Sequence, residues 1–121
     1  ETVGAAKGEQ IAGAKIVAVG AHSSENIIAS KSVNAGKDIT VDAGKDYKLK
    51  SGSNMLMQAD GDLGIKGEKK AVIEIKDQLT IKVGKAMITL KKNGDITIEG
   101  KNINTKGSGN IVMKAKKILE N

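Results

Sequence analysis

The stretch "GKDITVDAGKDYKLKSGSNMLMQADGDLGIKG", residues 36–67, repeats with a period of eight residues. Each unit places two large apolar residues at fixed positions and a small residue after them, and the first units begin with glycine. A fixed internal period is the signature of repeat architectures, so this octad decides the fold. Two apolar columns run through it, Ile39, Tyr47, Met55, Leu63 and Val41, Leu49, Met57, Ile65.

The period of eight fits a strand and does not fit a helix. Eight helical residues turn through about 800°, which is about 80° past two full turns, so the apolar stripe would spiral around a helix. In a strand, side chains alternate between two faces, and an even period returns every column to the same face. Each octad therefore predicts a strand of about five or six residues, followed by a corner with Gly or Asp.

The columns continue in both directions. Upstream, Val3, Ile11, Val19 and Ile27 lie eight apart in a stretch rich in Ala and Lys, where propensity alone favours a helix. The octad favours strands there too. We predict one structural domain with N-terminal octads in residues 1–35 and regular to slightly irregular octads, ending in a C-terminal tip, in residues 36–121.

The spacing becomes irregular near the C-terminus. The intervals between Ile96, Ile103, Ile111 and Ile118 are seven, eight and seven residues. This predicts shortened turns near Gly100 and near Gly107 or Gly109.

The composition predicts that one chain cannot fill its own interior. The sequence has no Trp, Phe, Pro or Cys and only one Tyr, and each octad offers only two or three inward side chains. Three chains around a threefold axis would fill a narrow prism, and a missing Pro suits strands that lie inside a ladder. We therefore predict an all-β fold: a trimeric, triangular, intertwined β-helix, at least ~70 Å long. Its core columns would contain Val33, Ile39, Val41, Tyr47, Leu49, Met55, Met57, Leu63, Ile65, Ile73, Leu79 and Ile81.

The charge pattern indicates a solvated exterior. The net charge is +6, and the 20 basic residues, all Lys, are interleaved with 14 carboxylates. Nucleic-acid binding usually uses Arg forks or aromatic platforms, which this chain lacks, so we expect no nucleic acid partner. Outward Lys would also keep a long β-structure from pairing sideways. Weak, salt-sensitive binding to anionic surfaces stays an alternative.

Candidate metal and catalytic residues favour structural roles. The column Asp38, Asp46, Asn54 and Asp62 resembles calcium-binding β-roll repeats, but those follow a nonapeptide, so corner residues are the better interpretation. His22, the only histidine, lies in that outward column without other ligands. Met55, Met57, Met87 and Met113 are interpreted as core filling. No nucleophile, base and pocket come together, so we predict no enzyme, cofactor or metal site.

The octads, the opening "ETVGAAK" and the closing "ITLKKNGDITIEGKNINTKGSGNIVMKAKKILEN" resemble the C-terminal needle of VgrG proteins, over essentially the whole chain. These valine–glycine repeat spikes of bacterial type VI secretion systems are similar to the puncturing needles of contractile phage tails. The resemblance implies a homotrimeric spike that pierces a target cell envelope. The family's N-terminal domains are absent, so the sequence looks like a fragment, and Val–Gly octads are eroded after Gly52.

The resemblance also implies partners and a location. A PAAR-repeat protein would cap the tip formed by the C-terminal strands, where Ile111, Met113, Ile118 and Leu119 would lie. Effectors would be carried at this tip, the tube protein would join through the missing N-terminal part, and contact with the target membrane would be transient. The spike would assemble in the bacterial cytoplasm and then be secreted without a signal peptide.

A different functional class is a trimeric phage tail spike or fibre module that binds bacterial surface polysaccharide. Such modules usually display aromatic or paired-carboxylate grooves, and the lack of Trp and Phe disfavours this alternative.

Overall fold

The structure of the protein is a computed structural model that describes residues 4–121. Residues 1–3, which are the first three letters of "ETVGAAK" and include Val3 of the upstream column, lie outside the described residues. The chain divides into two units, Glu1–Met55 and Leu56–Asn121.

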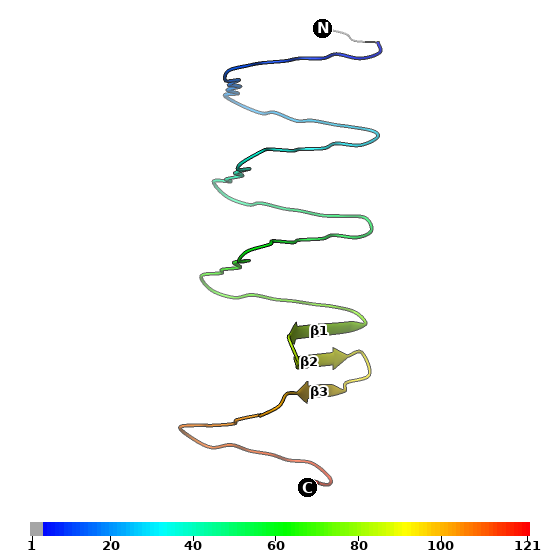
Figure 1. Ribbon diagram of the computed structural model, residues 1–121, viewed down its shortest axis with the longest axis vertical. Coiled ribbons are helices and arrows are strands. Elements are labelled where there is room, and N and C mark those ends of the chain that lie inside the picture. Colours follow the sequence, from blue (N-terminus) through cyan, green and yellow to red (C-terminus); the bar gives the residue numbers. More distant parts are fainter. Residues whose placement is uncertain (1–3) are drawn as a thin grey trace. The chain divides into compact units, whose positions relative to one another are not determined.

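The first unit is extended chain broken by evenly spaced bends. Within residues 4–55 the structure contains no helix, so the Ala- and Lys-rich beginning is extended, as the octad predicts. Figure 1 shows the straight stretches and the bends that join them. The bends fall eight residues apart, at 4–5, 12–13, 20–21, 28–29, 36–37, 44–45 and 52–53.

The second unit contains the regular strands of the described chain. Bends at 60–61, 68–69 and 76–77 continue the series and lead into a three-stranded antiparallel sheet. Its strands are β1 (Gln78–Val83), β2 (Ala86–Lys91) and β3 (Ile96–Glu99), in the order β1-β2-β3. They form a meander that is visible in Figure 1. The expected β class is therefore confirmed.

Glycine makes the first hairpin turn possible. Gly84 and Lys85 connect β1 to β2, and Gly84 has a φ of 55° while no described non-glycine residue has a positive φ. Gly at the first central position with an ordinary residue at the second is the pattern of a type II′ turn. Its twist matches the right-handed twist of the flanking strands, so the two strands pair up to the turn itself, with Val83 opposite Ala86.

The second turn uses an Asn-Gly pair. The Gly94 N–H donates to the Lys91 carbonyl at 3.0 Å, and Gly94 has a φ of 97°. The Asn93 side chain stabilises the loop, because its Oδ1 accepts from the Asp95 N–H and its Nδ2 donates to the Asp95 carboxylate, both at 3.1 Å. A turn followed by a left-handed Gly is a common way to close a hairpin with a slightly longer loop.

The register sorts the side chains of the sheet onto two faces. Cross-strand partners share a face, and here Leu79 pairs with Leu90 and Ile81 pairs with Ile88. One face is wholly apolar and contains Leu79, Ile81, Val83, Ala86, Ile88, Leu90, Ile96 and Ile98. We call it the apolar sheet face. The opposite face contains Gln78, Thr80, Lys82, Met87, Thr89, Lys91, Thr97 and Glu99.

The shortened turns expected near Gly100 and near Gly107 or Gly109 are not present. Bends at 101, 108–109 and 116 remain in the eight-residue series. The irregular isoleucine spacing has another cause. A two-residue antiparallel connection pairs odd with even positions, as in Ile81 with Ile88. The apolar residues of β2 and β3 must therefore move by one place to stay on one face. After β3, Ile103 returns to the original column.

Outside the sheet, the strands predicted in the octads are extended segments without a ladder. Residues 8–76 make no backbone–backbone hydrogen bond. Along the chain, the first such bond after this stretch is at Asp77, whose carbonyl accepts from the Lys92 N–H at 2.9 Å. Strand pairing thus needs a neighbouring backbone, and in these octads the chain does not provide one to itself.

The first turn can be tested with a matched pair of substitutions. Gly84 and Gly36 both have open space where a Cβ would lie, but only Gly84 has a positive φ. We expect Gly84→Ala to lower the free energy of unfolding by about 1–2 kcal/mol per chain, the cost of a left-handed non-glycine residue. Gly36→Ala should be neutral or stabilising by about 0.5 kcal/mol. Urea unfolding of both variants measures this, and equal effects would contradict the assigned turn.

Candidate functional site

The candidate functional site is the set of apolar columns along the bent chain. A compact protein of this size exposes roughly 6,200 Å², whereas this chain of 12.6 kDa exposes 13,732 Å². No apolar side chain in the described residues is buried, and Thr89 is the buried polar one. Within each unit the columns therefore form an exposed apolar surface, and such surfaces mark interaction sites.

The two faces of the octads differ in exposure. Ile27 lies in a column and is 43% exposed, while its neighbour Ile28 lies outside the columns and is 101% exposed. In the second unit, Ile111 and Val112 differ in the same direction, at 53% and 70%. In each of these pairs the column side chain is the less exposed one, as expected where column residues share one side of the chain.

The residues predicted for the core columns lie on this apolar surface. In the single chain they are exposed, except Leu79, which is half-buried in β1. The predicted tip residues Ile111, Met113, Ile118 and Leu119 are also exposed, in the extended segments around the bends at 108–109 and 116. The columns and the tip therefore have their side chains available for contact with other molecules.

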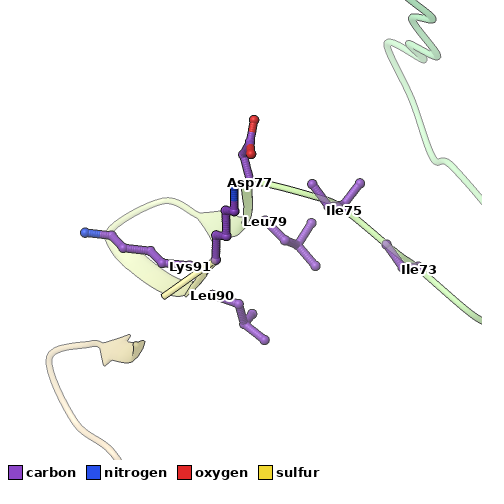
Figure 2. Close-up of a pocket in the computed structure, with 7 residues that line it drawn as sticks. Ile73, Ile75, Asp77, Leu79, Leu90 and Lys91 are labelled. Atoms are coloured by element: carbon purple, nitrogen blue, oxygen red, sulfur yellow. The ribbon is translucent and has the colours of Figure 1, made fainter. Parts of the chain in front are cut away.

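A hollow joins the octads to the apolar sheet face. It has a volume of about 150 Å³ and lies where the segment before β1 meets β1 and β2. Figure 2 shows Ile73, Ile75, Leu79 and Leu90 around this space, with the ionic ends of Asp77 and Lys91 directed away from it. Pockets for small molecules usually reach about 300–1,000 Å³, so the hollow is too small for one. It makes the apolar surface continuous from octad to sheet.

Two equivalent ion pairs bridge bends of the first unit. Lys15 Nζ lies 3.0 Å from Glu9 Oε2 across the bend at 12–13, and Lys31 Nζ lies 2.6 Å from Glu25 Oε2 across the bend at 28–29. All four side chains are about half exposed. Exposed pairs contribute only about 0–1 kcal/mol to stability, so these two pairs are not what holds the bends in place.

The described residues offer no cluster of metal-ligating side chains. Between residues 4 and 121 no three His, Cys, Asp or Glu side chains converge on one point. His22 and the column of Asp38, Asp46, Asn54 and Asp62 are exposed. In the same part of the chain, no helix has the length and apolar character needed to cross a bilayer.

The antiparallel hairpins are not among the elements expected from the octads, although the sequence contains a signal for them. Asn93 and Gly94 lie between two alternating apolar runs, "MITL" and "ITI", and Asn-Gly in that setting is a strong hairpin signal. Gly84 likewise lies between two alternating runs, "LTIKV" and "AMITL". The apolar sheet face thus includes Ile88, Leu90, Ile96 and Ile98, which the predicted core columns omit.

No family model, curated protein or solved structure matches this chain. The resemblance to VgrG needles therefore rests on the octads and the terminal residues quoted for it, and it stays a prediction from the sequence.

The ion pairs give a test of what holds the bends. Glu25→Gln removes the carboxylate charge opposite Lys31 and keeps the size of the side chain. Because the pair is exposed, we expect the free energy of unfolding to fall by no more than about 0.5 kcal/mol. Glu9→Gln, at the equivalent bend, is the matched control and should behave alike. A loss above about 1 kcal/mol in thermal or urea unfolding would show that the pair fixes the bend.

Proposed function

We propose that three copies of this chain wind together into a rigid needle, and that this needle is the puncturing spike of a type VI secretion system. The observation that supports this most directly is the state of residues 8–76. They hold extended, evenly bent conformations with no backbone hydrogen bonds among themselves and with exposed apolar columns.

The energetic argument concerns the ordering of this extended chain. Fixing a backbone costs about 1–2 kcal/mol per residue, and within residues 8–76 neither a ladder nor a buried core offsets that cost. Partner strands would supply both. Pairing needs strands with the same bend every eight residues, and another copy of this chain meets that need. Three copies suit columns that contain small side chains such as Ala43, Ser51 and Ala59, because these allow close approach at an axis.

A needle of this kind performs mechanical work. Continuous ladders would resist bending and axial load, and the interleaved Lys and carboxylates would face water and keep needles apart. The net charge of +6 per chain amounts to +18 for three copies. The proposed activity is penetration of a target envelope, and any chemistry would belong to carried proteins.

The proposed partners follow from the same assignment. The C-terminal strands, with Ile111, Met113, Ile118 and Leu119, would form the tip that receives a PAAR-repeat cap and effectors. The other end would join the tube through further domains. The spike would assemble in the bacterial cytoplasm, leave the cell with the secretion tube and contact the target membrane only while it passes through.

The first test is the mass of the protein in solution. We expect three times 12.6 kDa, about 38 kDa, in sedimentation at micromolar concentration without denaturant. Electron microscopy of the same sample should show thin rods of uniform length. A stable species of 12.6 kDa would remove the basis of the proposal.

The second test uses neighbouring residues on opposite faces. Val41 lies in an apolar column and Thr40 lies on the other face, and both are exposed in the single chain. We expect Val41→Lys to abolish the 38 kDa species at micromolar concentration, since an unpaired charge in an interior costs roughly 3–5 kcal/mol. Thr40→Lys should leave the mass unchanged. The same mass for both variants would contradict an inward column at Val41.

A further inference from the structure

The sheet β1–β3 is the part of the described chain that pairs with itself. All three strands come from residues 78–99, so the contacts are local in sequence. Local pairing forms fast, on the order of 1–10 μs for a hairpin, whereas residues 8–76 need strands from elsewhere. A chain that has just been made can therefore build this sheet before any partner arrives.

The octads leave the alignment of copies poorly defined. A shift of one copy by eight residues places Ile39 against the level of Tyr47 and Val41 against that of Leu49, and every side chain stays on its face. Registers are specified only where a slip costs energy, and a slip between nearly equal octads costs little. A repeat of this kind needs a separate element that fixes its alignment.

The sheet has the properties of such an element. Strand β2 runs opposite to β1, and its apolar residues occupy positions one place away from the octad columns. In a copy shifted by eight residues, β2 would lie at the level of β1 or of β3 of its neighbour. The two strands would then run in opposite directions, and Ile88 would not lie at the position of the octad column that Ile81 occupies. The mismatch penalises every slipped alignment.

We propose that residues 78–99 start the association of the three copies and set their register, by packing the apolar sheet face of each copy against the same face of the other two. This inference rests on the proposed trimer and adds the element that aligns it. The sheet forms first, the copies meet through it, and the octads pair outward from the aligned sheets.

Three observations identify other copies of this chain as the occupant of the apolar sheet face. The face contains eight apolar residues and no charge, so it offers nothing to a charged partner. It is continuous with Ile73 and Ile75 through the hollow in Figure 2, so a partner that covers it must also cover columns with a period of eight. The chain also exposes 13,732 Å², whereas a compact protein of its size exposes roughly 6,200 Å², and this excess is much larger than the about 800 Å² per partner of a standard interface.

The exposed sheet would be marginal before association. Three strands with a hydrophobic face are about the minimum for independent stability. Within the sheet Ile81 is 51% exposed and Ile96 is 66% exposed, so the face gains most of its burial from the other copies. The sheet thus forms in the single chain, and association stabilises it.

The test compares the rate of assembly of full-length variants after dilution from denaturant, followed by light scattering. Ile88→Lys places a charge on the apolar sheet face, Val41→Lys places the same charge in an octad column, and Thr97→Lys places it on the polar face of the sheet. We expect Ile88→Lys to slow association at least tenfold. Val41→Lys should show an initial association rate within about threefold of the parent chain, and its transient complex should then dissociate, because the contacts of residue 41 form after the rate-limiting step. Thr97→Lys should match the parent in both rates.

The alignment of the copies can be measured separately by disulfide crosslinking, because the chain contains no cysteine of its own. A single Val41→Cys in each copy should be crosslinked to other copies by mild oxidation in the aligned trimer, and adding Ile88→Lys should reduce that yield severalfold. Equal association rates for Ile88→Lys and Val41→Lys, in a parent that is trimeric, would overturn the role of the sheet and leave the needle intact. A parent chain that stays at 12.6 kDa, or that becomes ordered only with a different protein, would overturn both proposals.

Discussion

The structure depends on one constraint, which is that an extended backbone must find a partner for its N–H and C=O groups. Residues 8–76 hold strand-like segments but pair with nothing in their own chain, and their apolar columns are exposed. Water can satisfy the polar groups, but water does not offset the entropy of holding dozens of residues in fixed conformations. Within the chain, neither a ladder nor a buried core offsets that entropy in residues 8–76, and in our proposal other copies of the chain supply both.

The sheet at residues 78–99 meets the same constraint locally. Gly84 and Gly94 allow the chain to reverse direction, so three consecutive strands supply one another with hydrogen bonds. The reversal moves the apolar positions of β2 and β3 by one place, which keeps eight apolar side chains on a single face. The chain thus combines a self-paired element with a long stretch of octads that cannot pair alone, and the two kinds of segment have different roles in our proposals.

The sequence predicted the β class and the eight-residue spacing of the bends, while the strands expected in the octads before β1 are extended segments without a ladder. An even period fixed which side chains share a face, and the bends recur every eight residues from 4–5 to 76–77, including the Ala-rich beginning where propensity favours a helix. The hairpins depart from the octad because turn chemistry takes precedence at "KVGKAM" and "KKNGD", and the reversal of direction there, not a shortened turn, changes the isoleucine spacing. The number of copies depends on contacts between chains and not on contacts within one.

The even spacing of the bends has a consequence for how the length of such a protein can evolve. Duplication or deletion of eight residues leaves every following side chain on the same face, so the molecule would grow or shrink by whole octads. A single-residue insertion between bends would turn every later side chain to the opposite side, as far as the next compensating change. We expect natural length variants of this chain to differ in steps of eight, with the segment around Gly84 and Gly94 preserved intact.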